Sequence, residues 1–149
     1  MIDRAARSDL AERIRQLVAG QITNDEFEDR TNPRSLDRAV EAVRDGAWGL
    51  YSDTREYRLV GKYPLNLEAR HAVARWIVFL QTDLEYEWPR IGPMAMIGLL
   101  LAGFLTVGLV RIPFRIWFSK HGEFSAWPFI RAEDLEEARK HPRYLAGAV

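Results

Sequence analysis

The chain has 149 residues, which is enough for one ordinary domain or for a small domain with an appendage. Lys and Arg together number 21 and so do Asp and Glu, so the formal net charge is zero, which argues against a dedicated nucleic-acid-binding protein. Cysteine is absent, and this excludes disulfide scaffolds, thiol catalysis and metal sites built on thiolates.

The first piece of the chain, residues 1–90, has the patterns of a small helical domain. Leu10, Ile14 and Leu17 fall on one face of a first helix, because apolar residues three or four apart share a helical face. Gly20 is suited to end that helix, since glycine adopts the left-handed conformation of a C-terminal cap without strain. We therefore expect residues 1–90 to fold mainly as packed helices.

Capping residues predict where the next helices start. Thr23 and Glu26 have the spacing of a capping box, in which each side chain satisfies a free backbone N–H of the other. The acidic run that they open also favours the positive end of a helix dipole. Ser35 is the expected cap of a third helix, and Asn66 of a long helix over about 67–84.

Residues 47–63 change character, with several aromatic side chains around a short polar stretch, Ser52-Asp53-Thr54. This pattern fits either a short hairpin or an irregular aromatic loop, and the sequence does not decide between them. Together with one aromatic residue of the long helix, this region is a candidate docking surface, although we favour an ordinary core role for the same side chains. The residues concerned are Trp48, Tyr51, Tyr57 and Trp76.

Residues 91–110 form a run of twenty residues without a charge, in which only Thr106 is polar. As a helix, this run would cover roughly 30 Å, the thickness of the hydrocarbon core of a bilayer. The alternative is a fully buried core helix, which the remaining charged residues could hardly surround. We therefore predict a transmembrane helix here and a single-pass membrane protein.

The predicted span carries a stripe of small residues, Gly98, Ala102 and Thr106, at intervals of four. Small residues at this spacing let two membrane helices approach closely, so the stripe predicts a helix–helix contact and self-association. Side chains typical of membrane interfaces flank the span on both sides. The expected interface anchors are Trp88, Arg111, Arg115, Trp117 and Phe118.

The last piece, residues 111–149, is expected to form an interfacial segment followed by a charged tail. Residues 131–141 are highly charged and predicted to be helical. Glu133, Glu137 and His141 line up at steps of four along this helix, but such a ladder is usually a solvated face rather than a metal site. We predict no metal and no cofactor.

Two passages resemble known proteins. Residues 10–30 contain Leu17, Gly20, Ile22-Thr23 and Glu26-Phe27-Glu28, and this run resembles the SHOCT motif, a short helical pattern of many bacterial proteins. The resemblance implies oligomerisation or docking and no catalysis. The passage Phe79-Leu80-Gln81-Thr82-Asp83-Leu84-Glu85-Tyr86-Glu87-Trp88-Pro89 looks like small bacterial membrane proteins, which implies a place in the bacterial inner membrane.

Two indications of membrane orientation conflict. More basic residues follow the predicted span than precede it, which favours a cytoplasmic C-terminus. Export of an N-terminal domain of this size without a signal peptide is difficult, however, and we therefore expect the N-terminal domain to be cytoplasmic. The basic residues near the span are Arg75 and Arg90 before it, and Arg111, Arg115, Lys120 and Arg131 after it.

No pattern in the chain predicts an enzyme. The serines lack a nucleophile-elbow context and no glycine-rich phosphate loop is present, so no small-molecule substrate is evident. We expect a single-pass membrane-anchored interaction or assembly module that contacts lipid and either a protein partner or further copies of itself. Two alternatives stay open: a soluble immunity- or antitoxin-like protein with a buried apolar helix, and an accessory subunit of a membrane enzyme complex.

Overall fold

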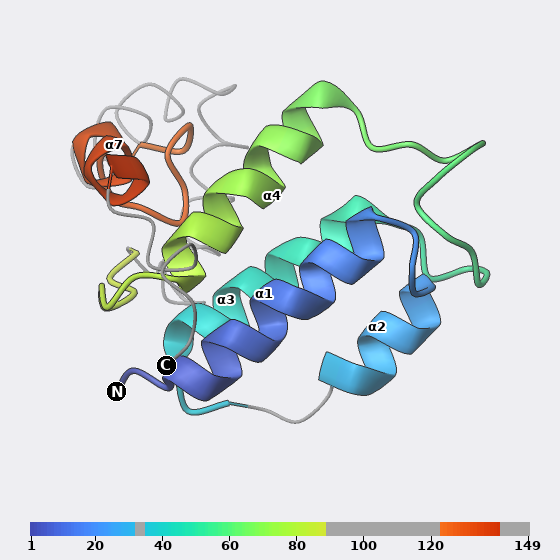
Figure 1. Ribbon diagram of the computed structural model, residues 1–149, viewed down its shortest axis with the longest axis horizontal. Helices are drawn as coiled ribbons and strands as arrows, with labels where there is room; N and C mark the ends of the chain where they lie inside the picture. The colour runs from blue at the N-terminus through green and yellow to red at the C-terminus, as the bar shows by residue number, and fades with distance from the viewer. Residues whose placement is uncertain (32–34, 89–122, 141–149) are drawn as a thin grey trace, which may run out of the picture.

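The computed structural model of the chain describes residues 1–31, 35–88 and 123–140. Five α-helices and one short 3-10 helix occupy these ranges, which contain no strand, so the prediction of a mainly helical fold is confirmed. With the labels of Figure 1, the helices are α1 (Arg4–Val18), α2 (Asn24–Thr31), α3 (Arg38–Ala47), η1 (Trp48–Leu50), α4 (Leu67–Leu80) and α7 (Ala132–Lys140).

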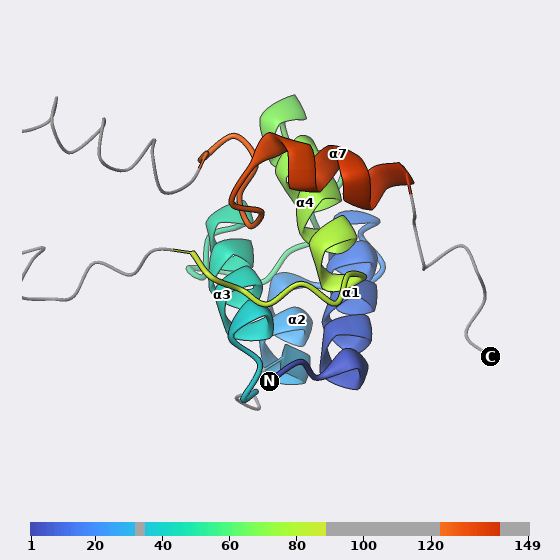
Figure 2. The same cartoon turned by 90° about the vertical axis from the view of Figure 1, so that its left-hand side faces the viewer.

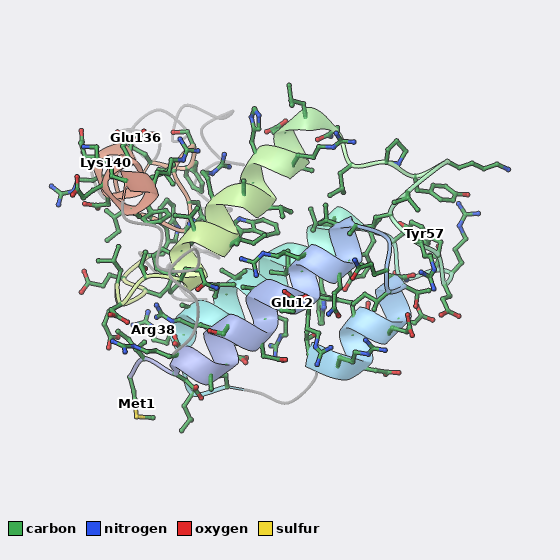
Figure 3. All side chains as sticks on the ribbon, in the orientation of Figure 1. Met1, Glu12, Arg38, Tyr57, Glu136 and Lys140 are labelled. Carbon is green, nitrogen blue, oxygen red and sulfur yellow. The ribbon has the colours of Figure 1, made fainter. Side chains whose placement is uncertain are left out.

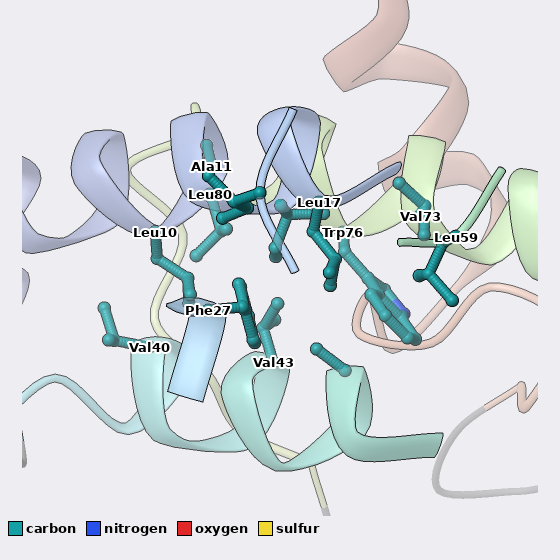
Figure 4. Close-up of a cluster of buried hydrophobic side chains, with 13 residues drawn as sticks. Leu10, Ala11, Leu17, Phe27, Val40, Val43, Leu59, Val73, Trp76 and Leu80 are labelled. Atoms are coloured by element: carbon teal, nitrogen blue, oxygen red, sulfur yellow. The ribbon is translucent and has the colours of Figure 1, made fainter. Parts of the chain in front are cut away.

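Three helices enclose the main core. α1 and α3 lie side by side in the same direction, and α4 packs on both of them in the opposite direction (Figure 1). The helix α2 packs against α1 on the side opposite α4 (Figure 1). Figure 4 shows how apolar side chains of all four helices meet there, among them Leu17, Phe27, Val43 and Trp76. Burial of this apolar surface is the main favourable contribution to folding.

Two of the predicted caps are confirmed. In the capping box, the Thr23 N–H donates to Glu26 Oε2 at 2.9 Å and the Glu26 N–H donates to Thr23 Oγ1 at 3.1 Å. At the start of α4, the side chain of Asn66 accepts a hydrogen bond of 2.7 Å from the N–H of Ala69. Each bond satisfies a backbone donor that the helix itself leaves free.

Two other local predictions are wrong. The cap of α3 is Asp37 rather than Ser35, because the carboxylate of Asp37 accepts the N–H of Ala39 at 2.9 Å. The helix α4 ends at Leu80 rather than at residue 84, and the hydroxyl of Thr82 donates to the carbonyl of Phe79 at 2.7 Å just beyond this end. Leu84 is consequently 44% exposed instead of inward-facing.

Residues 47–63 form an irregular loop after η1 and not a hairpin. The left-handed glycine at the end of α1 brings this loop close to the first helix. Gly20 has a φ of +68°, and a side chain there would meet Val60 at 2.6 Å. Glycine is therefore required at this position both by its backbone conformation and by the close approach of the loop.

The segment 123–140 packs on the helical body, and within it α7 is the helix expected over residues 131–141. The start of the expected interfacial segment, residues 111–122, lies outside the described residues. Trp127 meets Trp76 edge to face at 5.5 Å between ring centroids, and Phe129 meets Phe79 at 4.9 Å. The helix α7 lies across α4 and buries Leu135 (Figure 2). The charge pattern of 131–141 concealed this apolar contact, because a single leucine supplies most of the inward face.

No helix in the described ranges is long and apolar enough to cross a membrane. The predicted span 91–110 lies outside the described residues, and so do its small-residue stripe and most of the expected anchors: Gly98, Ala102, Thr106, Arg111, Arg115, Trp117 and Phe118. The remaining anchor, Trp88, is buried in a second cluster, where its ring contacts Phe124 at 5.4 Å between centroids. In the folded body Trp88 is thus a packing residue rather than an exposed anchor.

Candidate functional site: an acidic aromatic pocket

The four aromatic residues of the predicted docking surface do not form one surface. Trp76 is only 5% exposed and belongs to the core, as the alternative interpretation expected. Tyr57 lies on the loop beside α2 (Figure 3), where its ring contacts Tyr63 at 4.7 Å between centroids. Trp48 and Tyr51 instead line one pocket of about 200 Å³ together with two carboxylate residues. We call this the Trp48 pocket; its lining residues are Glu28, Trp48, Tyr51 and Asp53.

The walls of the Trp48 pocket come from three neighbouring elements. Trp48 opens η1 directly after α3, Tyr51 follows η1, and Glu28 lies on α2. The ring of Tyr51 rests edge to face on the fully buried Phe27, at 6.2 Å between centroids. Because Phe27 is part of the main core, the core fixes the position of one aromatic wall.

A buried asparagine holds the loop that carries Asp53. The backbone N–H of Asn24 donates to the carbonyl of Tyr57 at 3.1 Å, and the N–H of Tyr57 donates back to Asn24 Oδ1 at 2.7 Å. The side-chain amide of Asn24 also donates to the carbonyl of Arg55 at 3.1 Å. The loop around Asp53 is thus tied to the start of α2, on the same helix that presents Glu28.

The electrostatic environment of the Trp48 pocket is negative. Burial, and then the negative charges of Glu28, Asp25 and Asp53 together with hydrogen bonding to Glu28, raise the pKa of Tyr51 well above its usual range. The Tyr51 hydroxyl oxygen is shielded from solvent and makes no well-formed hydrogen bond, although Glu28 lies near enough to act on it. Tyr51 therefore stays a neutral phenol at ordinary pH, and the pocket attracts positive charge.

Besides Asn24, two charged residues of the described ranges are buried, Arg7 and Asp37, and their role is structural. Arg7 and Asp37 are 1% and 2% exposed and form an ion pair with an N–O distance of 2.6 Å. Burial acts to raise the pKa of Asp37, but hydrogen bonds from Arg7 and from the backbone of Asp3 and Ala39 hold it below its usual value. This pair is sealed from solvent, so it offers no binding site.

Two larger hollows lie where residues 81–88 meet α7, with volumes of about 440 and 400 Å³. Leu84 and Asp134 line both of them. The first also contains Arg131, which pairs with Asp134 at 3.6 Å and offsets its charge. The first hollow therefore combines both signs of charge, unlike the Trp48 pocket. In the second hollow, the lining carboxylates of Asp134 and Glu137 are paired with Arg131 and Lys140.

The described residues contain no group of three His, Asp or Glu side chains able to hold a metal ion. Glu137 of the expected ladder forms an ion pair with Lys140 at 3.2 Å, and its neighbour Glu136 pairs with Arg139 at 2.6 Å. Figure 3 shows Glu136 and Lys140 on the outward side of α7. His141, the third member of the ladder, lies outside the described residues.

No family model, curated protein or solved structure matches this chain. The resemblance of residues 10–30 to the SHOCT motif therefore stays a prediction. The sequence also did not identify Glu28 and Asp53 as pocket residues. The available signal is an acidic run on α2 beside an aromatic loop, and the helix dipole alone already accounts for such a run.

Proposed function

We propose that this protein is a membrane-anchored interaction module without catalytic activity, and that its whole folded body lies on one side of the bilayer. The anchor in this proposal is the uncharged run 91–110, whose length and composition are those of a segment buried in lipid. The folded body would then present docking surfaces at the membrane.

The observation that carries the one-sided arrangement is the contact between Trp88 and Phe124. These residues flank the apolar run on either side, yet their ring centroids are 5.4 Å apart. A single crossing would separate the two flanks by a hydrocarbon core about 30 Å thick. The packing of α7 on α4 supports the same arrangement, because it joins the second flank to the first. We therefore propose an anchor that enters and leaves through the same face, in place of a single-pass span.

The length of the intervening chain limits how deep such an anchor reaches. Residues 89–122 number 34, and as helix they would extend about 50 Å in total at 1.5 Å per residue. Two full crossings of the hydrocarbon core need about 60 Å before any turn is counted. An extended return strand would leave backbone groups without partners in lipid, which is costly. Residues 89–122 are thus too few for two full helical crossings of the hydrocarbon core.

The absence of cysteine makes a direct test of this topology straightforward. Ser8→Cys and Ser125→Cys place single thiols at exposed positions on the two sides of the apolar run. We expect a membrane-impermeant maleimide to label both variants in inside-out vesicles and neither in sealed right-side-out vesicles. The unsubstituted protein is the matched control, since it has no thiol to label.

Two outcomes would contradict the proposal. Labelling of the two thiols from opposite sides would restore the single crossing. Release of the unsubstituted protein by alkaline carbonate would remove membrane anchoring altogether and favour a soluble protein that buries its apolar segment against a partner.

A further inference from the structure

The two carboxylates of the Trp48 pocket lack a cationic partner within the described residues. Neither Glu28 nor Asp53 forms an ion pair there, whereas other acidic residues nearby do. Glu26 on the same helix pairs with Arg30 at 3.4 Å, and Glu41 on α3 pairs with Arg44 at 2.8 Å. Two carboxylates from different elements thus face one cavity with no positive charge to balance them.

The aromatic walls of the pocket are suited to a cation. Trp48 is 57% exposed, so much of its indole ring is accessible to a ligand or a partner. The faces of Trp and Tyr rings attract cations, and Trp does so most strongly. Carboxylates beside such rings add charge and accept hydrogen bonds from N–H groups.

The lining distinguishes among cations. A metal ion needs more oxygen ligands than two carboxylates supply, and the described residues hold no metal-binding group. A quaternary ammonium has no N–H with which to satisfy Glu28 and Asp53. A guanidinium is planar and has several N–H groups that point in different directions. It can therefore stack on the aromatic rings and donate hydrogen bonds to the carboxylates at the same time.

We infer that the Trp48 pocket binds a guanidinium group, presented as an arginine side chain on the surface of a partner protein. The volume of about 200 Å³ suits one side chain rather than a folded segment. Trp48 would cover the guanidinium plane while Glu28 and Asp53 accept its N–H groups. This inference rests on the proposed interaction role and names its chemistry, but it does not require the membrane anchor.

The test uses the full chain in detergent and two blocked tripeptides, acetyl-Gly-Arg-Gly-amide and the same peptide with citrulline in place of arginine. Citrulline has nearly the same shape but no charge. We expect the arginine peptide to shift the indole N–H resonance of Trp48, assigned with Trp48→Phe, with a Kd on the order of 1 mM. Glu28→Gln and Asp53→Asn should each weaken binding about tenfold.

The matched control for the pocket variants is Asp29→Asn, which removes one negative charge from α2 at an exposed position outside the pocket lining. It should bind the arginine peptide as the unsubstituted protein does. Equal binding of the citrulline peptide, or equal weakening by Asp29→Asn, would overturn the inference. Because the peptides are soluble, failure here would leave the vesicle labelling result unaffected, so the two proposals fail separately.

Discussion

At the scale of single residues, Arg7 connects three parts of the chain. Its guanidinium donates to both carboxylate oxygens of Asp37, at 2.6 and 3.2 Å. It also donates to the carbonyls of Thr82 and Leu84, at 2.8 and 3.0 Å. The carbonyls belong to the chain just after α4, and Asp37 caps α3, so one side chain on α1 fixes the ends of two other helices. This bridge also explains why the chain leaves α4 at Leu80 in a defined direction.

Substitution of Asp37 should therefore lower the free energy of unfolding and change how this free energy depends on pH. Asp37→Asn leaves the buried Arg7 charge without its counterion, a loss that typically costs about 3–5 kcal/mol. The folded-state pKa of Asp37 lies below its unfolded value, so its stabilising contribution is complete above the unfolded pKa. That contribution is lost as the pH falls through the lower, folded-state pKa. The variant should thus lose less stability than the unsubstituted protein over this acidic range.

Urea unfolding at pH 7 and at a series of pH values down to about 3 measures both effects. The control is Asp83→Asn, because Asp83 pairs with the exposed Arg4 at the surface. Its effect at pH 7 should be at most about 1 kcal/mol. An Asp37→Asn variant as stable as this control would show that the buried pair is not needed for stability.

At the scale of helices, the sequence predicted what is encoded locally. The capping box at Thr23 and the cap at Asn66 follow from residue types at fixed spacings, and both are correct. The cap of α3 was assigned to the wrong residue because Asp37 and Ser35 are both good capping residues. What selects Asp37 is its contact with Arg7, thirty positions away in sequence, which no local pattern contains.

Long-range packing accounts for the other differences between the predicted and the observed structure. The segment 123–130 has no helical period, and its Trp127 and Phe129 are placed by partners on α4 that precede them by about fifty residues. Only the aromatic residues of the Trp48 pocket were among the candidates from the sequence, and the reason is similar. Its aromatic residues are neighbours in sequence and were recognised, whereas Glu28 reaches them only through the packing of α2 beside the loop.

Substitution of Gly46 on α3 tests whether the ring of Trp127 packs against this helix. A methyl group on Gly46 would lie 2.7 Å from the ring of Trp127, so Gly46→Ala should displace the ring and loosen the segment that follows it. We expect a loss of about 1–3 kcal/mol, as for other overpacked sites. The control is Gly49→Ala, where no atom lies within 4 Å of the added methyl group.

Urea unfolding of the two alanine variants gives this comparison, and limited proteolysis between residues 123 and 131 reports the loosening directly. Equal stability and equal cleavage of both variants would mean that Trp127 does not pack on α3. A greater loss for Gly49→Ala would contradict the described packing as well.

At the scale of the whole molecule, a one-sided anchor removes the conflict between the two indications of orientation. With a single crossing, the basic residues before and after the apolar run compete for the same side of the membrane. If both flanks lie on one face, Arg90, Arg111, Arg115 and Lys120 all favour that face being cytoplasmic. Under this proposal, the side expected for the N-terminal domain and the side that the basic residues favour are the same.

The close approach of the two flanks leads to a prediction about a shortened protein. The segment ending at residue 88 and the one starting at residue 123 emerge on the same side of the body (Figure 2). Replacing residues 89–122 with a Gly/Ser linker of about six residues, which reaches roughly 20 Å, should therefore preserve the fold. The shortened protein should be soluble without detergent, because it lacks the apolar run.

Circular dichroism and urea unfolding should reveal a cooperative helical protein. Adding Phe129→Ala to the shortened chain provides the control, since Phe129 is fully buried against Phe79 and its loss should cost about 3–5 kcal/mol. If the shortened chain failed to fold, or if Phe129→Ala left its stability unchanged, segment 123–140 would not be an integral part of the body. The one-sided anchor would then lose its structural basis, because that arrangement depends on both flanks being held together.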